Sequence, residues 1–325
     1  MHSLIDRYRE RLPVSADTPV VSLGEGSTPL LRAPRLSERL GVELYLKWEG
    51  ANPTGSFKDR GMTVAISKAV ESGARAVICA STGNTAASAA AYAARGGLTA
   101  VVLQPAGAVA SGKLAQARAL GARVLEVRGS FDEALSAARE LAERGSHVLV
   151  NSLNPDRLEG QKTAAFEIVE ELGATPDVLA LPYGGGGNLT AYARGFAETG
   201  ALPRLVAGEA SQRSSTIATA IRIAEPAHAA TAADATSRSD GEIVRLQDEA
   251  ILDAWRELAH REGVFCEPSS AAGLAALGSV DLASGSTVVC VVTGHGLKDP
   301  DTAARLSPEP VLVDPDPDAI EAASR

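Results

Sequence analysis

The sequence predicts an α/β protein in which mostly parallel strands alternate with helices. Short runs rich in Val, Ile and Leu recur along the 325 residues, and most are continuously apolar rather than alternating. Continuous apolar strands are typical of parallel sheets that are covered on both faces. Because amphipathic segments separate these runs, we expect right-handed strand–helix–strand units in an open α/β architecture.

Each expected element follows from one of these two patterns. Strands are expected at the apolar runs 43–48, 75–80, 98–104, 122–127, 146–151, 177–182, 204–209 and 286–293. Helices are expected where apolar residues recur at spacings of three and four, at 59–72, 131–144, 157–172 and 247–262. The polar, small-residue segment 228–241 is expected to be a mobile loop, and the acidic tail 314–325 is expected to be exposed.

Composition excludes several classes of function. Lys and Arg total 31 against 40 Asp and Glu, so the net charge of −9 gives no overall attraction to nucleic acid or an anionic membrane. No apolar run is long enough to span a bilayer and the N-terminus is too charged for a secretory signal, so we expect a cytoplasmic protein. The three cysteines have no metal-binding spacing, so no metal is expected.

A single lysine in the stretch NPTGSFKDRG raises the first question about function. Lys58 stands beside Ser56 and Phe57, after a Gly-containing turn that opens a predicted helix. A lysine in this setting is either a solvated first-turn cation or a nucleophile held for use.

Two polar loops follow predicted strands and precede helices, where α/β proteins bind ligands. The polar residues of STGNTAAS are Ser81, Thr82, Asn84 and Thr85. Their hydroxyl and amide groups, with nearby backbone N–H groups, can surround an anion such as a carboxylate. The alternative is that they are plain helix caps. The second loop, in YGGGGN, consists of Gly184, Gly185, Gly186, Gly187 and Asn188. Four glycines permit a nest of backbone N–H groups that binds phosphate. The alternative is a flexible loop. The pattern is not the G-x-G-x-x-G of dinucleotide sites.

Two further segments complete the candidate site. Thr293 ends the last predicted strand, where its hydroxyl can hydrogen-bond a ring nitrogen, and His295 nearby is either part of the site or structural. In NSLNPDRLEGQK, Ser152, Asn154 and Arg157 cluster at a helix start and predict a second anion site. Lys113 either joins that site or is a solvated first-turn lysine.

Two phosphate sites, a carboxylate cradle and one placed lysine fit pyridoxal 5'-phosphate. Its phosphate would bind in the glycine nest, its aldehyde would form a Schiff base with Lys58, and its ring nitrogen would hydrogen-bond Thr293.

The motifs occur in the order found in threonine synthases, which the chain resembles from about Gly24 to Pro300. They are EGSTPL, KWEGANPTGSFKDRGM, STGNTAAS, NSLNPDRLEGQKT, GGGGN, CEPSSAA and TGHGLKD. The resemblance implies that Lys58 holds the cofactor covalently and acts in catalysis. It also implies that Asn84 bonds the cofactor's 3-hydroxyl, that residues 184–188 hold its phosphate, and that Thr293 partners its pyridine nitrogen.

For the substrate, the resemblance implies two groups of residues. Ser81, Thr82 and Thr85, beside Asn84, match the carboxylate loop. Ser152, Asn154 and Arg157 match the group that holds the substrate's own phosphate, and Lys113 stays a candidate beside them.

The resemblance also implies a fold, a reaction and an assembly. The fold would have two open, twisted, mostly parallel sheets flanked by helices, with the active site in a cleft between a large domain (1–50 and 157–325) and a smaller mobile one (51–156). The reaction would convert O-phospho-L-homoserine and water to L-threonine and phosphate, in a homodimer. Ser27 stands where the family often has Asn, and the stretch 206–223 is shorter than usual.

Three alternatives stay open at this point. A threonine dehydratase-like ammonia-lyase would share the cofactor residues but need no Arg157. A pyridoxal phosphate enzyme of specialised metabolism could carry out a related γ/β-replacement. A phosphate- or nucleotide-binding module would use the two loops without catalysis, but it leaves Lys58 unexplained.

Overall fold

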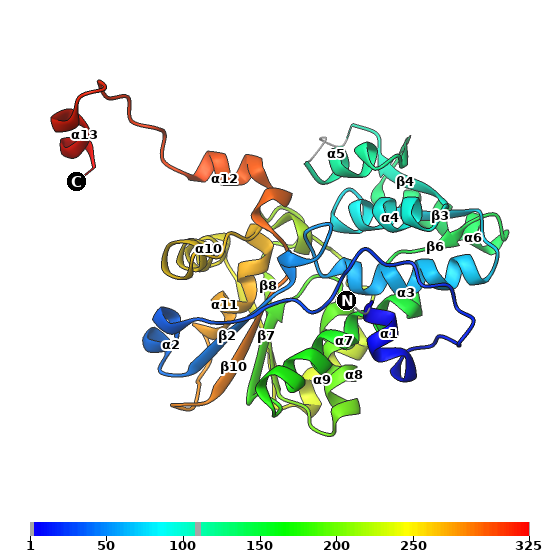
Figure 1. The fold of residues 1–325 in the computed structure, drawn as a ribbon, viewed down its shortest axis with the longest axis horizontal. Coiled ribbons are helices and arrows are strands. Elements are labelled where there is room, and N and C mark those ends of the chain that lie inside the picture. Colours follow the sequence, from blue (N-terminus) through cyan, green and yellow to red (C-terminus); the bar gives the residue numbers. More distant parts are fainter. Residues whose placement is uncertain (1–2, 108–111, 325) are drawn as a thin grey trace.

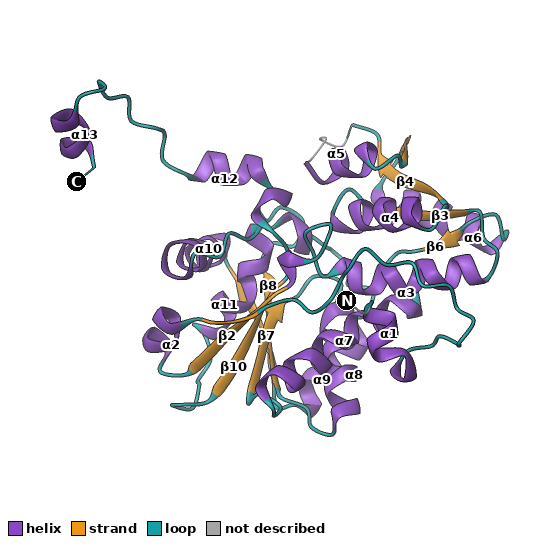
Figure 2. Cartoon of the chain, viewed as in Figure 1, coloured by secondary structure: helices purple, strands orange, loops and turns teal. Residues whose placement is uncertain are grey.

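Two sheets organise the chain in the computed structural model, which describes residues 3–107 and 112–324 (Figures 1 and 2). The six-stranded sheet has the order β1-β2-β10-β7-β8-β9 and the four-stranded sheet the order β5-β4-β3-β6. Within both sheets every neighbouring pair of these strands is parallel except β1 and β2. The predicted α/β class with two mostly parallel sheets is confirmed.

The larger sheet consists of β1 (Leu30–Arg32), β2 (Glu43–Trp48), β7 (Val178–Pro182), β8 (Arg204–Ala210), β9 (Glu242–Leu246) and β10 (Thr287–Val292). The smaller sheet consists of β3 (Ala76–Ala80), β4 (Thr99–Pro105), β5 (Arg123–Val127) and β6 (Val148–Leu149). All eight predicted strands are confirmed, with shifts of at most two residues at their ends. The strands β1 and β9, both at edges of the larger sheet, were not predicted.

The helices cover both faces of each sheet. They are α1 (Leu4–Tyr8), α2 (Pro34–Leu40), α3 (Lys58–Glu71), α4 (Asn84–Arg95), α5 (Gly112–Ala119), α6 (Phe131–Glu143), α7 (Pro155–Leu172), α8 (Gly187–Thr199), α9 (Ala229–Arg238), α10 (Asp248–Glu262), α11 (Ala272–Leu277), α12 (Pro300–Leu306) and α13 (Pro317–Ala323). Short 3₁₀ turns lie at Arg9–Arg11, Glu49–Ala51, Thr219–Ile221, Pro268–Ala271 and Gly296–Lys298. On the larger sheet, α7, α8 and α9 share one apolar core while α2, α10 and α11 share another. The four predicted helices correspond to α3, α6, α7 and α10 and are confirmed.

One predicted loop is a helix instead. The segment 228–241, expected to be mobile, contains α9, and this helix packs on α8 and β8. Ala232, Ala235 and Thr236 are buried there. Small residues can pack closely against a neighbouring helix even though they carry no large apolar side chain, so tertiary contact forms this helix rather than a strong local pattern.

The two sheets meet where α3 crosses α7. Gly61 and Gly160 lie at the crossing, because a Cβ on Gly160 would stand 2.0 Å from the Arg60 carbonyl oxygen, and one on Gly61 would stand 2.5 Å from that of Arg157. Beside the crossing the buried Arg60 guanidinium forms ion pairs with Glu49 and Glu167 at 2.7 and 2.6 Å. Glycine therefore permits a close contact that a buried charge network then fixes.

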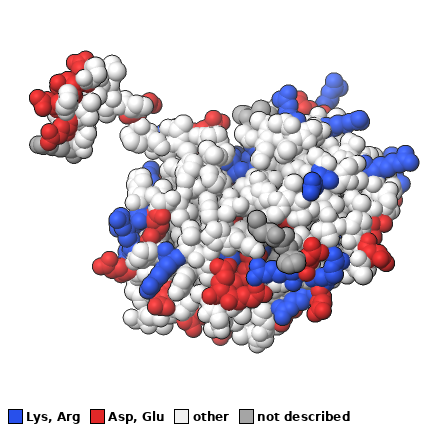
Figure 3. All heavy atoms as spheres, in the orientation of Figure 1, with Lys and Arg blue, Asp and Glu red and all other residues white. Residues whose placement is uncertain are grey.

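The C-terminal arm, residues 308–324, stands clear of the rest of the molecule (Figures 1 and 2). None of the residues of α13 is buried, and Figure 3 shows acidic side chains gathered on this helix. The predicted exposure of the acidic tail is confirmed for its described residues. Leu312 in the arm is 98% exposed. Within the described residues, no helix is both long and apolar enough to cross a membrane.

Candidate active site

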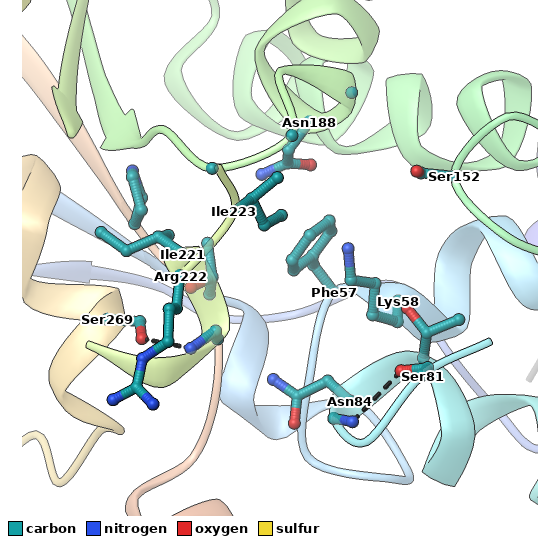
Figure 4. A pocket seen from close by; sticks show the side chains of 18 of the residues that line it. Phe57, Lys58, Ser81, Asn84, Ser152, Asn188, Ile221, Arg222, Ile223 and Ser269 are labelled. Carbon is teal, nitrogen blue, oxygen red and sulfur yellow. Dashed lines mark hydrogen bonds between the residues drawn. The ribbon is translucent and has the colours of Figure 1, made fainter. Parts of the chain in front are cut away.

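A cavity of about 240 Å³ lies at the carboxyl ends of strands from both sheets (Figure 4). The segments after β3, β7 and β10 line it, together with the first residue of α3 and the turn 219–223. Ligands of open α/β proteins gather at this end of the strands. Of the predicted site residues, the cavity lining includes Lys58, Ser81, Thr82, Asn84, Thr85, Ser152, Gly184, Gly185, Gly186, Gly187, Asn188 and Thr293.

Lys58 is positioned by a loop that is tied to the end of β10. Ser56 forms a bridge with Gly294, and the Phe57 N–H donates to the Thr293 carbonyl at 3.1 Å. The amine then points into the cavity beside the Phe57 ring, whose centroid is 4.2 Å from Nζ (Figure 4).

The amine of Lys58 is unusually acidic for a lysine. No hydrogen bond or ion pair from the described residues holds Nζ. Burial, and next the nearby Arg157 charge, lower its pKa to about 7, although Glu267 opposes the shift. Part of the amine is therefore unprotonated near neutral pH, and its place beside the Phe57 ring favours the held nucleophile over a solvated first-turn cation.

The STGNT loop leads into α4 without a side-chain cap. Gly83 is the N-cap residue and has no side chain that could cap the helix. The Ser81 hydroxyl instead accepts from the Gly83 N–H at 3.1 Å. The lack of a side-chain cap at Gly83 favours the anion-binding interpretation of this loop, because N–H groups in the first turn of a helix can bind an anion.

The glycine loop is held in place by α9. The His228 N–H donates to the Gly185 carbonyl at 3.0 Å, and its Nε2 lies 2.9 Å from the Ser152 carbonyl oxygen. Gly186 has φ +79°, and a Cβ there would stand 2.9 Å from the His228 carbonyl oxygen, so only glycine fits well. The loop is therefore fixed against a helix, and α8 starts from it without a side-chain cap.

Thr293 lies at the wall of the cavity and already has a neighbour. Its Oγ1 is 2.8 Å from Oγ of Ser270, which also accepts from the Gly294 N–H at 2.8 Å. His295 does not reach the cavity lining, and its Nδ1 caps the next turn by accepting from the Leu297 N–H at 3.1 Å. The geometry favours the structural interpretation of His295.

The predicted second anion site is only partly gathered. Ser152 lines the cavity, but Asn154 and Arg157 do not. Asn154 caps α7, accepting from the Asp156 N–H at 2.9 Å and donating to the Leu149 carbonyl at 2.9 Å. Arg157 is fully buried, and Nη1 donates to the Val150 carbonyl at 3.2 Å, while Nε and Nη2 have no hydrogen-bond partner among the described residues.

Lys113 is buried, so the alternative of a solvated first-turn lysine is wrong. Its side chain is 5% exposed, and Nζ lies 2.6 Å from Oε2 of Glu267. It also donates to the Thr219 hydroxyl at 3.3 Å. Lys113 therefore stands at the edge of the cavity through its two contacts, both of which are with residues of the cavity lining.

Several lining residues were not predicted. The most buried of these charged groups is Glu267, which is 1% exposed and whose Oε1 accepts from Nδ2 of Asn84 at 2.5 Å. Glu267 belongs to CEPSSAA, which lies between a predicted helix and the last apolar run. A carboxylate at this position in the sequence could have indicated a site residue. The others lie mainly in the turn after β8 and at the start of α6: Phe131, Thr219, Ile221, Arg222, Ile223 and Ser269.

Comparison with known proteins agrees with this geometry. The family model described as "Pyridoxal-phosphate dependent enzyme" matches residues 21–294. The chain is 52% identical to a threonine synthase of Halalkalibacterium halodurans, covering 92% of this chain and 90% of that one. It is also 52% identical to a threonine synthase of Mycobacterium tuberculosis, and the match covers 96% of this chain and 93% of that one. A maize serine racemase structure superposes with a TM-score of 0.75 at 25% identity, covering 86% and 90%.

The chain therefore belongs to the family of pyridoxal-phosphate dependent enzymes, and within it to the threonine synthases. This family is enzymatic, so the alternative of a phosphate- or nucleotide-binding module is wrong.

The residues present fit pyridoxal phosphate. Two buried polar atoms at the cavity, Oδ1 of Asn84 and Nδ2 of Asn188, have no hydrogen-bond partner in residues 3–107 and 112–324. The loop around Gly186 and the first turn of α8 offer N–H groups without a side-chain cap, as a phosphate requires. Lys58 supplies an amine whose pKa burial lowers to about 7. No group of His, Cys, Asp and Glu among residues 3–107 and 112–324 is placed to hold a metal ion.

Proposed function

We propose that this chain converts O-phospho-L-homoserine and water to L-threonine and phosphate. The observation that carries the proposal is the combination of 52% identity to threonine synthases with buried cations beside the cofactor cavity. The substrate has a carboxylate and a phosphate, which need two anion sites in addition to the one for the cofactor's phosphate. The STGNT loop and the group around Arg157 are the candidates.

Residues of the cavity have separate parts in this reaction. When bound here, pyridoxal phosphate supplies an electron sink conjugated to the substrate's amine, which acidifies protons at Cα and Cβ. Lys58, with a pKa of about 7, is the group that removes and returns these protons. Ser81, Thr82 and Thr85 would hold the carboxylate so that Cα faces Lys58.

The leaving phosphate needs positive charge and hydrogen-bond donors. Arg157 has two nitrogens without partners, and Lys113 is a buried ammonium at the cavity edge. Ser152 adds a hydroxyl in the cavity lining. Donors and charges fixed in place before the reaction stabilise negative charge that develops on the departing group. Asn154 shapes this site through its cap on α7.

The test is an assay of the purified, cofactor-loaded protein with O-phospho-L-homoserine. We expect phosphate and L-threonine to appear in equal amounts. A threonine dehydratase-like enzyme would instead release ammonia and 2-oxobutyrate from threonine, and would leave the phosphorylated substrate intact. A specialised γ/β-replacement enzyme would release phosphate without forming threonine.

We further propose that the chain is a cytoplasmic homodimer with a mobile smaller domain, divided as 1–50 with 157–325 and 51–156. The strands of the four-stranded sheet all lie between 76 and 149, which supports this division. The exposed arm supports pairing, because Val311 and Leu312 are 75% and 98% exposed in a single chain. Light scattering should give twice the 33.4 kDa of one chain. A monomeric mass would contradict the pairing.

A further inference from the structure

Glu267 joins the two sides of the cavity, and the reaction as proposed gives it no part. Its Oε1 accepts from Asn84 at the start of α4, and its Oε2 pairs with Lys113 in α5. Both helices belong to the side of the smaller sheet. Glu267 itself follows the bridge between Cys266 and His295, beside the end of β10 in the larger sheet. One carboxylate therefore holds two polar side chains from across the cavity.

The charges around the cavity are unbalanced. Lys113 and Arg157 are two buried cations beside the cavity, and of these two only Lys113 has a carboxylate within ion-pair distance among the described residues. Arg157 has no such partner, and burial lowers its pKa to about 10. An anion that enters this region gains from the uncompensated charge.

The contact between Glu267 and Lys113 is one that an anion can displace. Oε2 lies 2.6 Å from Nζ, yet it accepts no hydrogen bond of normal geometry. The pair therefore depends on charge more than on aligned donors. An ammonium group has three donors on a flexible stem, so it can turn from one anion to another without moving its backbone. A phosphate dianion carries twice the charge of the carboxylate.

We propose that Glu267 is a positioning residue that holds Lys113 and Asn84 at the cavity until the substrate's phosphate arrives and takes Lys113 from it. This inference rests on the proposed function, since the incoming anion is the phosphate of the substrate. Glu267 then acts on specificity, because a substrate without a phosphate leaves the carboxylate and Lys113 paired. It also speeds release of product phosphate, because it recaptures Lys113.

The test is E267Q in the full, cofactor-loaded chain, with inorganic phosphate as the probe. The cofactor occupies the glycine loop, so calorimetry with phosphate reports the second anion site. Gln keeps an oxygen that accepts from Asn84 but removes the charge that competes for Lys113. We expect the Kd for phosphate to fall at least threefold. We also expect KM to fall, because the substrate's phosphate no longer competes with a carboxylate for Lys113, and kcat to fall, because product phosphate leaves more slowly. An unchanged or raised Kd would overturn the inference.

E198Q is the matched control, because Glu198 of α8 pairs with the buried Lys162 of α7 at 2.7 Å, and neither residue lines the cavity. It should leave both the Kd and the kinetics unchanged. Should E267Q fail to fold, E267D replaces it in the test. Aspartate is one methylene shorter, so its carboxylate lies farther from Lys113, and we expect the Kd for phosphate to fall as in E267Q. If E267D leaves the Kd unchanged, the inference fails.

The two proposals can fail separately. Formation of threonine by the wild type, together with an unchanged Kd in E267Q, would refute the role of Glu267 alone. The absence of threonine, together with a lowered Kd in E267Q, would refute the substrate assignment while supporting competition between Glu267 and a phosphate group.

Discussion

Arg157 should make the protein less stable than it would be without this charge. The guanidinium is fully buried, has no carboxylate partner among the described residues, and makes one hydrogen bond, to the Val150 carbonyl. Burial lowers its pKa to about 10, against an ordinary value of about 12.5. Since one pKa unit is worth about 1.4 kcal/mol, the buried charge costs about 3 kcal/mol.

The sign of the effect follows from the direction of the shift. A cation whose pKa is lowered by folding destabilises the folded state fully below the folded value, so the cost is complete at pH 7.5. R157M keeps an unbranched side chain and removes the charge, while losing one hydrogen bond worth about 1 kcal/mol. We therefore expect R157M to be about 2 kcal/mol more stable than the wild type in phosphate-free buffer.

Urea unfolding of the cofactor-loaded proteins, followed by circular dichroism at a fixed cofactor concentration, measures this difference. R60M is the matched control, because Arg60 is equally buried but paired with Glu49 and Glu167. Its loss should cost about 3 to 5 kcal/mol. Phosphate at a hundred times its Kd should stabilise the wild type by about 2.7 kcal/mol and R157M by much less. A destabilised R157M, or equal stabilisation of both proteins by phosphate, would refute the reasoning.

Three further predictions follow from single residues. Lys58 in the cofactor-free protein should react with an amine-acylating reagent at half-maximal rate near pH 7, because its pKa is lowered to about 7 and the protonated amine is unreactive. Peptide mass spectrometry at a series of pH values measures the rate. A half-maximum near pH 10 would contradict the prediction. Burial raises the pKa of Asp59 to about 6, so its contribution to stability falls as the pH rises from about 4 to about 6. D59N should therefore gain about 2 to 3 kcal/mol relative to the wild type across that interval, measured by urea unfolding at each pH, and a constant difference would count against the shift. G186A should destabilise the cofactor-free protein by about 1 to 2 kcal/mol in urea unfolding, because Ala at φ +79° is strained and crowds the His228 carbonyl. G185A is the control. A Cβ on Gly185 would meet its nearest atom at 3.5 Å, so this change should have little effect on stability.

The fold could be predicted where a local pattern coincides with burial. The continuous apolar runs became strands, because both faces of these parallel sheets are covered. β1 was missed because an edge strand of three residues, Leu30–Arg32, leaves too short a pattern. α9 was missed because its buried residues are Ala and Thr, whose helical spacing carries little hydrophobic signal.

The candidate site could be predicted where its residues follow strands directly. The loops at Asn84 and Gly186 and the hydroxyl of Thr293 all come at strand ends, so the parallel arrangement brings them together. Glu267 and His228 could not be assigned in this way. Their positions depend on how the two sheets pack and on a helix whose sequence gave no clear signal.

The close crossing of α3 and α7 links the stability of the fold to the chemistry of the cavity. Lys58 is the first residue of α3 and Arg157 lies in the first turn of α7, so the distance between these helices sets the distance between the two cations. Gly61 and Gly160 allow the helices to touch, since a Cβ at either position would overlap the facing backbone. The Arg157 charge in turn helps to lower the pKa of Lys58. The two glycines therefore act on the protonation of an amine that neither of them contacts, because a larger residue would separate Arg157 from Lys58 and let the pKa of the amine rise.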